Sequence, residues 1–186
     1  MPERASRGER GATPGRIRRK RAALAAGTGI PVAVLLATLA SRPGPLLVWN
    51  ASPSSPIGLY RVTAAQGADS GDMVIAWPPG PARVLGAERH YLPRNVPLVK
   101  RVAAAAGDRV CARGTAITVN GRPVATRRAS DPSGRPLPWW WNGCEVLRGS
   151  DLLLLSIAAP QAFDGRYFGI SRSDLIVGRA RLLWPR

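Results

Sequence analysis

Histidine, lysine, cysteine and acidic residues are all scarce in this chain of 186 residues. The one histidine, His90, lies in a polar stretch, and no G-x-S-x-G motif is present, so nothing indicates a Ser-His-Asp triad. Two cysteines and one histidine cannot form a convincing zinc site, and the glycine-rich loop that binds phosphates is missing. The sequence therefore predicts an activity that needs no metal and no cofactor.

Lysine is the most informative of these scarce residues. Lys20 and Lys100 are the only two lysines beside 25 arginines. An arginine in a protein does not lose its proton, whereas a lysine can. A strand over Pro97–Val102 would place Leu98, Lys100 and Val102 on one face. Burial among apolar neighbours lowers the pKa of a lysine, so Lys100 either acts as a base or extends its amine to the surface.

The overall charge is strongly basic, with 27 Lys and Arg against 11 Asp and Glu. Such a balance is typical of proteins that bind nucleic acid or an anionic membrane surface. Residues 1–21 hold eight of the cations against Glu3 and Glu9, and the rest are scattered over residues 42–186 without a long basic run. The scatter favours a solvated basic surface over specific DNA contact, so no nucleic-acid partner is expected.

Residues 22–40 form the longest run without a charge, directly after a basic cluster. The run is long enough to cross a bilayer, and its basic flank predicts a cytoplasmic N-terminal end. A cleaved signal peptide is the alternative, because Thr38 and Ala40 could form a cleavage site. We expect a basic cytoplasmic segment over residues 1–21, a membrane anchor or signal segment over residues 22–41, and an exported domain over residues 42–186.

Export also bears on the two cysteines, Cys111 and Cys144. In an oxidising compartment they can form a disulfide, which we favour over a buried pair of free thiols. Both states fit the sequence.

Short strands and turns are predicted for the exported part, since 18 Pro and 20 Gly argue against a helical bundle. Asn120-Gly121 predicts a tight hairpin. No helix is expected after the apolar run. Arg127–Trp141, with its three consecutive tryptophans, is expected to be a long exposed loop that contacts the membrane interface, a substrate or the protein itself. The predicted strands are Leu59–Val62, Met73–Trp77, Leu98–Ala103, Arg109–Ala112, Ile117–Val119, Val124, Leu152–Ser156 and Leu175–Leu183.

Two serines, Ser54 and Ser55, lie between two prolines soon after the apolar run, in Asn50–Tyr60. Because the prolines restrict the backbone, the hydroxyl of Ser54 can be held in place with little local motion. The alternative from composition is a simple Ser/Pro linker.

Together these segments resemble the bacterial type I signal peptidases, most closely their conjugative-transfer branch. Asn50–Tyr60 is similar to that branch's nucleophile box, S-x-P-x-G-L-Y, and places the catalytic serine at Ser54. Lys100–Asp108 resembles the lysine box, K-R-V followed by G-D, and Phe163–Gly169 resembles the last box, D-x-R-Y-x-G. Gly71–Val74 fits the box that starts a strand between the first two.

The resemblance implies a mainly β catalytic domain with the coiled sheets of signal peptidases and LexA, preceded by one N-terminal transmembrane helix. It implies that Ser54 attacks the scissile carbonyl and that Lys100 takes its proton. The backbone N–H of Ser54 and the hydroxyl of Ser52 would form the oxyanion hole. Asp164 and Arg166 would be structural partners near the site.

Two positions depart from the family pattern. Many relatives have a hydroxyl two positions before the Asp of the last box to orient the lysine, but here that residue is Ala162. Ser156, another hydroxyl, or packing alone must then orient Lys100. In addition, Ser55 follows Ser54 directly, and only the spacing to the next proline favours Ser54 as nucleophile over Ser55.

The function implied by the resemblance is a membrane-anchored Ser–Lys endopeptidase that processes exported precursors, with a pilin-type substrate of a conjugative transfer system. The catalytic domain would lie at the outer, periplasmic face of the cytoplasmic membrane and bind its substrate as an extended strand. Its acyl-enzyme could lead to hydrolysis or to cyclisation. The alternatives are a catalytically inactive envelope component of the same apparatus and a LexA-type regulator, although no upstream pair of DNA-binding helices is predicted.

Overall fold

The computed structural model describes residues 32, 34–37 and 44–186, of which Pro45–Arg186 form a unit of their own. The predicted cytoplasmic segment over residues 1–21 and most of the predicted anchor over residues 22–41 lie outside the described residues. Within the part that is described, no helix has the length and apolar character needed to cross a membrane.

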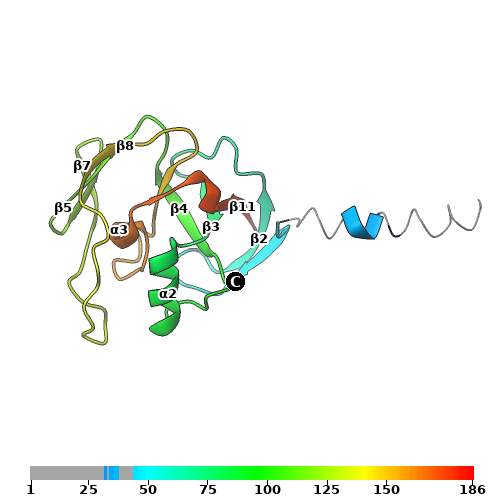
Figure 1. Ribbon diagram of the computed structural model, residues 1–186, viewed down its shortest axis with the longest axis horizontal. Coiled ribbons are helices and arrows are strands. Elements are labelled where there is room, and N and C mark those ends of the chain that lie inside the picture. The colour runs from blue at the N-terminus through cyan, green and yellow to red at the C-terminus, as the bar shows by residue number, and fades with distance from the viewer. Residues whose placement is uncertain (1–31, 33, 38–43) are drawn as a thin grey trace, which may run out of the picture. The chain divides into compact units, whose positions relative to one another are not determined.

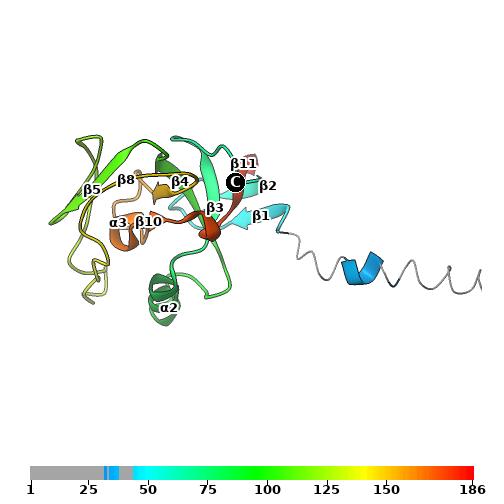
Figure 2. The ribbon, with the colours of Figure 1, turned by 45° about the horizontal axis from the view of Figure 1, so that its top comes forward.

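Residues 45–186 contain two antiparallel sheets, which lie beside each other (Figures 1 and 2). The larger sheet has seven strands in the order β1-β2-β11-β3-β4-β9-β10, and the smaller has four in the order β7-β6-β5-β8. The strands of the larger sheet are β1 Leu47–Asn50, β2 Gly58–Thr63, β3 Met73–Ala76, β4 Leu98–Ala104, β9 Leu152–Leu155, β10 Ile170–Ser171 and β11 Ile176–Pro185. Those of the smaller sheet are β5 Arg109–Arg113, β6 Ala116–Val119, β7 Arg122–Thr126 and β8 Gly143–Val146.

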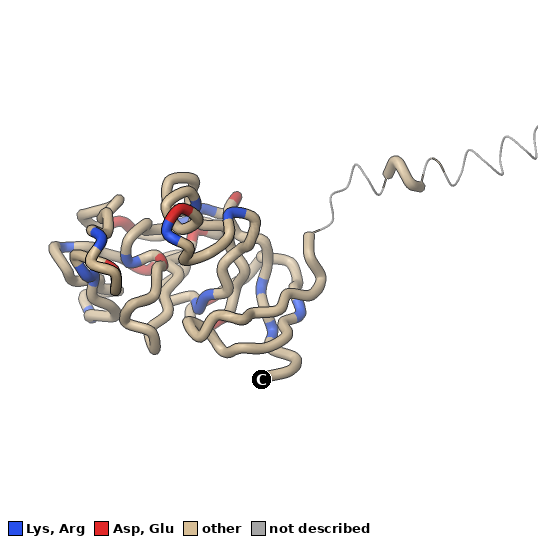
Figure 3. Tube along the Cα trace, turned by 90° about the horizontal axis from the view of Figure 1, so that it is seen from below, with Lys and Arg blue, Asp and Glu red and all other residues tan. Residues whose placement is uncertain are grey.

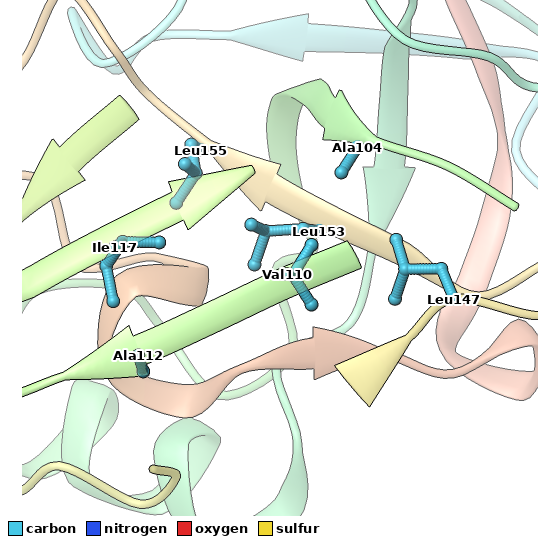
Figure 4. Close-up of a cluster of buried hydrophobic side chains, with 7 residues drawn as sticks. All are labelled: Ala104, Val110, Ala112, Ile117, Leu147, Leu153 and Leu155. Carbon is cyan, nitrogen blue, oxygen red and sulfur yellow. The ribbon is translucent and has the colours of Figure 1, made fainter. Parts of the chain in front are cut away.

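Strand β9 connects the cores of the two sheets. It consists of four leucines, all buried, as expected for a strand that is covered on both faces. Leu153 and Leu155 pack against side chains from β5 and β6 of the smaller sheet (Figure 4). Leu152 and Leu154 pack in a second cluster with residues of β3 and β4. The strand that leads directly to Ser156 is therefore among the most deeply buried parts of the fold.

The predicted mainly β architecture is confirmed, and each of the predicted strands overlaps an observed one. The predicted hairpin also forms, because Asn120 and Gly121 both have positive φ, at 51° and 79°, between β6 and β7. The structure further joins Cys111 and Cys144 by a disulfide between directly opposed residues of β5 and β8.

The expectation of no helix after the apolar run is wrong. A helix, α2, spans Gly80–Glu88, and two single turns follow later, α3 at Gly165–Phe168 and the 3₁₀ helix η1 at Ser173–Leu175. Helix α2 begins after Pro79, and its buried residues are only Ala82 and Gly86. A helix that buries small residues has no wide apolar stripe, so its period is not visible in the sequence.

The Arg127–Trp141 segment is a loop, as predicted, but its exposure was predicted wrongly in part. Arg127 is 2% exposed, and its guanidinium lies over the rings of Trp139 and Trp141 at 5.2 and 5.4 Å. Trp141 also packs on the hydrophobic cluster shared by the two sheets. The tryptophans thus contact the protein itself, mainly by enclosing a buried cation.

The buried carboxylate of Asp131 also fixes this loop. This carboxylate accepts hydrogen bonds from the hydroxyl of Tyr91, the backbone N–H of Ser133, and both the N–H and Nε of Arg135. These bonds hold the pKa of Asp131 far below its usual range, although burial acts in the opposite direction.

Lys and Arg are distributed over many separate parts of the described chain (Figure 3).

Candidate active site

The turn between β1 and β2 presents Ser54, and the side chain of Asn50 makes several of the hydrogen bonds that hold this turn together. The amide nitrogen of Asn50, at the end of β1, donates to the carbonyl oxygens of Ser52, Ser55 and Pro56 at 3.0, 3.1 and 3.0 Å. Its Oδ1 accepts from the N–H of Ser52 at 3.1 Å. Asn50 is 7% exposed, so these hydrogen bonds are shielded from solvent. No role for Asn50 was predicted from the sequence.

The hydroxyl of Ser54 contacts two other polar side chains. Lys100 Nζ donates to Ser54 Oγ at 2.7 Å, and Ser52 Oγ lies 2.9 Å from Ser54 Oγ on another side. The backbone N–H of Ser54 points to Ser52 Oγ at 3.4 Å. The structure therefore brings together the three residues that the sequence placed at the reacting centre, two from the turn and one from β4.

Lys100 comes from the middle of the larger sheet, where β4 lies between β3 and β9. It is 3% exposed, and its Nζ donates to Ser156 Oγ at 2.8 Å as well as to Ser54. Burial lowers the pKa of Lys100 to about 8, while the nearby Asp164 raises it and Arg166 lowers it further. A lysine with this pKa is partly neutral slightly above neutral pH and can accept a proton.

Asp164 and Arg166 form an ion pair that is itself buried, at 0% and 2% exposure. Arg166 Nε and Nη2 donate to the two carboxylate oxygens at 2.8 and 3.0 Å. The carboxylate also accepts from the backbone N–H of Ser156 at 2.8 Å and from that of Arg166 at 3.0 Å, which caps α3. Arg166 in addition donates to the carbonyl oxygens of Pro160, Ser156 and Ala159. Such complete bonding is what makes a buried ion pair tolerable.

Ser55, the alternative nucleophile, has a different environment. Its Oγ is buried and donates to the carbonyl oxygen of Val99 in β4 at 2.7 Å. The hydroxyl that Lys100 Nζ contacts belongs to Ser54. The geometry thus separates two neighbouring serines that the sequence left open, one facing the lysine and one facing the backbone.

Ser54 and Lys100 line an open cleft with a volume of about 760 Å³. Strand β1 borders it through Val48 and Trp49, and β1 is the outermost strand of the sheet, so its free edge is available to an extended peptide. The charged side chains of the lining, apart from Lys100, are Arg89, Arg128, Asp131 and Arg135. Further apolar lining comes from Leu92, Val96, Leu98, Leu137 and Phe163.

His90 follows α2 and is not among the residues that line this cleft. Nor do His, Cys, Asp and Glu side chains gather anywhere in the described part of the chain in a group of three or more that could hold a metal ion.

A family model for "Signal peptidase, peptidase S26" matches residues 19–185 of the chain. The chain belongs to this family, which makes it a serine peptidase of the signal peptidase type. A plasmid transfer protein TraF of Escherichia coli is 36% identical over 146 residues, 73% of this chain and 82% of that protein. A probable conjugal transfer protein TraF of Sinorhizobium fredii is 32% identical over 142 residues, 71% of this chain and 73% of that protein. The predicted resemblance to signal peptidases of the conjugative-transfer branch is confirmed.

Among solved structures, a signal peptidase I from Enterococcus faecalis covers 66% of this chain and all of its own. The two chains are 16% identical, and the TM-score is 0.34. The family assignment therefore depends on the sequence matches.

Proposed function

We propose that the protein is a Ser–Lys endopeptidase that cleaves exported precursor proteins, with Ser54 as nucleophile and Lys100 as general base. The 2.7 Å contact between Lys100 Nζ and Ser54 Oγ is the observation that carries this proposal. A buried amine of lowered pKa beside a hydroxyl in an open cleft is the arrangement that activates a serine without histidine.

The reaction begins once Lys100 has lost its proton to solvent. The Ser54 hydroxyl then donates to Nζ and attacks the scissile carbonyl carbon, and its proton moves to Lys100. The negative oxygen of the tetrahedral intermediate is stabilised by the Ser54 N–H and the Ser52 hydroxyl. Lys100 returns the proton to the leaving amine, and an acyl-enzyme on Ser54 remains. Attack on this ester by water completes hydrolysis, whereas attack by an amine of the same substrate closes a ring.

The proposed substrate is an exported precursor of the pilin type, because the relatives are plasmid and conjugal transfer proteins. The precursor would add to the free edge of β1 as an extended strand and place its scissile bond beside Ser54. The proposed setting is the outer face of the cytoplasmic membrane, with the segment over residues 22–41 as anchor and residues 42–186 as the peptidase domain.

Trapping of the acyl-enzyme tests this function directly. The full-length chain in detergent micelles is incubated with a mechanism-based serine acylator, and the modified residue is located by mass spectrometry of peptides. We expect one acyl group on Ser54 and none on the Ser54→Ala variant. Absence of any adduct, together with intact pilin precursor after incubation, would instead support the inactive envelope component.

Activity should rise with pH through the pKa of Lys100. Because the base must be neutral and its pKa is about 8, kcat/KM should increase about tenfold per pH unit below that value and level off above it. The measurement is precursor cleavage between pH 6 and 10 at constant ionic strength. Lys100→Arg, which keeps the charge but cannot give up its proton, is the control and should be inactive throughout. A profile that is flat across pH 8 contradicts Lys100 as the base.

A further inference from the structure

The cleft beside Ser54 carries more positive than negative charge. Apart from the proposed base, the charged side chains that line it are Arg89, Arg128, Asp131 and Arg135. The guanidinium groups therefore outnumber the one carboxylate among these lining side chains. A peptide bound in the cleft would lie close to these groups, so the cleft can distinguish substrates by their charge.

The carboxylate of Asp131 is already paired with two of these arginines. Arg135 Nε donates to it at 2.7 Å, and Arg89 Nη1 lies 3.8 Å from the same oxygen. Arg89 Nη1 also donates to the carbonyl oxygen of Pro136 at 2.9 Å. Arg89 and Arg135 thus hold the loop in place, and a ligand that bound either of them would have to compete with these contacts.

Arg128 differs from the other two arginines because only its backbone is held. Its N–H donates to the hydroxyl of Tyr167 at 3.2 Å, and its carbonyl oxygen accepts from Trp139 Nε1 at 3.3 Å. Arg128 is exposed, and its guanidinium forms no hydrogen bond or ion pair with any residue that the structure describes. The backbone of this residue is therefore anchored, while its charged group remains available to a ligand in the cleft.

A carboxylate is the peptide group that an available guanidinium binds best. The planar fork of N–H donors matches the two carboxylate oxygens, and the opposite charges strengthen both hydrogen bonds. The anchored backbone of Arg128 also reduces the entropy that is lost when the contact forms. In the middle of a peptide chain, a carboxylate can only come from the side chain of Asp or Glu.

We propose that Arg128 is a specificity-determining residue that binds the carboxylate of an Asp or Glu side chain in the substrate segment that occupies the cleft. The inference rests on the proposed function and adds a substrate class to it, namely precursors with an acidic side chain near the cleavage site. The remaining positive charge of the lining should disfavour a basic side chain at the same position.

Peptides that differ in a single charge test this selectivity. A labelled peptide spans the cleavage site of the precursor, has an amidated C-terminus and Gln in place of its acidic residues, and carries Glu, Gln or Lys at one position after another. With the full-length enzyme in detergent micelles, kcat/KM should be roughly tenfold higher for Glu than for Gln at one position, mainly through KM, and lowest for Lys. The positions directly before and after it should show no such preference, because the side chains of an extended peptide alternate between its two sides.

Three variants assign the preference to one residue. Arg128→Gln should remove it, and Arg128→Glu should reverse it, so that the Lys peptide becomes the best substrate. Arg122→Gln is the matched control, because Arg122 is exposed in β7, does not line the cleft, and its loss changes the net charge equally. This control should keep the preference for Glu. All three variants should cleave the Gln peptide within about twofold of the wild-type rate, since a neutral side chain makes no ion pair with Arg128.

The proposal is overturned if no position prefers Glu, if Arg128→Gln keeps the preference, or if Arg122→Gln removes it as well. It is also overturned if selection by charge appears only in a peptide with a free C-terminal carboxylate, which would assign Arg128 to the chain terminus.

Binding measurements separate this outcome from failure of the proposed function. Fluorescence anisotropy gives the Kd of the same peptides for the Ser54→Ala variant, which should bind them without cleaving. If Ser54→Ala cleaves like the wild type but still binds the Glu peptide more tightly than the Gln peptide, the catalytic proposal alone fails. If Ser54→Ala is inactive and binds the two peptides equally, the charge selection alone fails.

Discussion

Ser54→Ala is expected to abolish precursor cleavage, with kcat reduced by at least about 10⁴-fold, as in other enzymes that lose their nucleophile. Ser55→Ala is the matched control, since it removes the neighbouring hydroxyl from the same turn. That hydroxyl donates to the carbonyl oxygen of Val99 and does not face Lys100. The variant should lose about 1 kcal/mol of stability and keep most of its activity.

Both variants are measured as purified full-length chains by the rate at which precursor is converted to product. Thermal unfolding serves as the check that each is folded. The assignment of the nucleophile is wrong if Ser55→Ala is the inactive variant and Ser54→Ala cleaves at the wild-type rate.

Asp164→Asn is expected to lower the free energy of unfolding by about 3–5 kcal/mol. Asn has the same shape and can still cap α3, but it leaves the buried guanidinium of Arg166 without a counter-charge, and an uncompensated buried charge costs this much. Urea-induced unfolding followed by tryptophan fluorescence gives the value.

The control for this variant is Asp151→Asn. Asp151 also pairs with an arginine, at 2.6 Å, but Arg172 is 53% exposed. An ion pair in solvent contributes about 0–1 kcal/mol, so the control should change stability little. If both variants lose the same free energy of unfolding, the contribution of the Asp164–Arg166 pair to stability does not depend on its burial.

The sequence predicts most of the strands because strand periodicity is a local property. Lys100 illustrates this best: its place in a strand with apolar residues two positions away left two alternatives, a buried amine or one extended to the surface, and Lys100 is buried. Strand β8 was missed because all four of its side chains are exposed, so its residues carry no hydrophobic pattern. Strand β1 was missed because it is a short edge strand that forms through pairing with β2.

Other features depend on contacts between distant segments. The two tryptophans around Arg127 and the buried carboxylate of Asp131 turn a segment rich in Pro and Gly into an ordered wall of the cleft, and composition cannot indicate this. For the same reason, the sequence could not decide whether Ser156 or another residue supplies the second hydroxyl that contacts Lys100. Only the registers of β4 and β9 decide which side chain meets Lys100.

Ser54 and Lys100 are carried by parts of the larger sheet that differ in how many neighbouring strands they have. Lys100 sits on a strand with a neighbour on each side, whereas Ser54 is carried by a turn whose first strand, β1, pairs with β2 alone. The turn is held by the Asn50 amide, by the β1–β2 pairing, and by the hydroxyls of Ser55 and Tyr60, which donate to Val99 and Pro56. Opening of the β1–β2 edge is therefore expected to displace Ser54 while Lys100, on a strand paired on both sides, keeps its place.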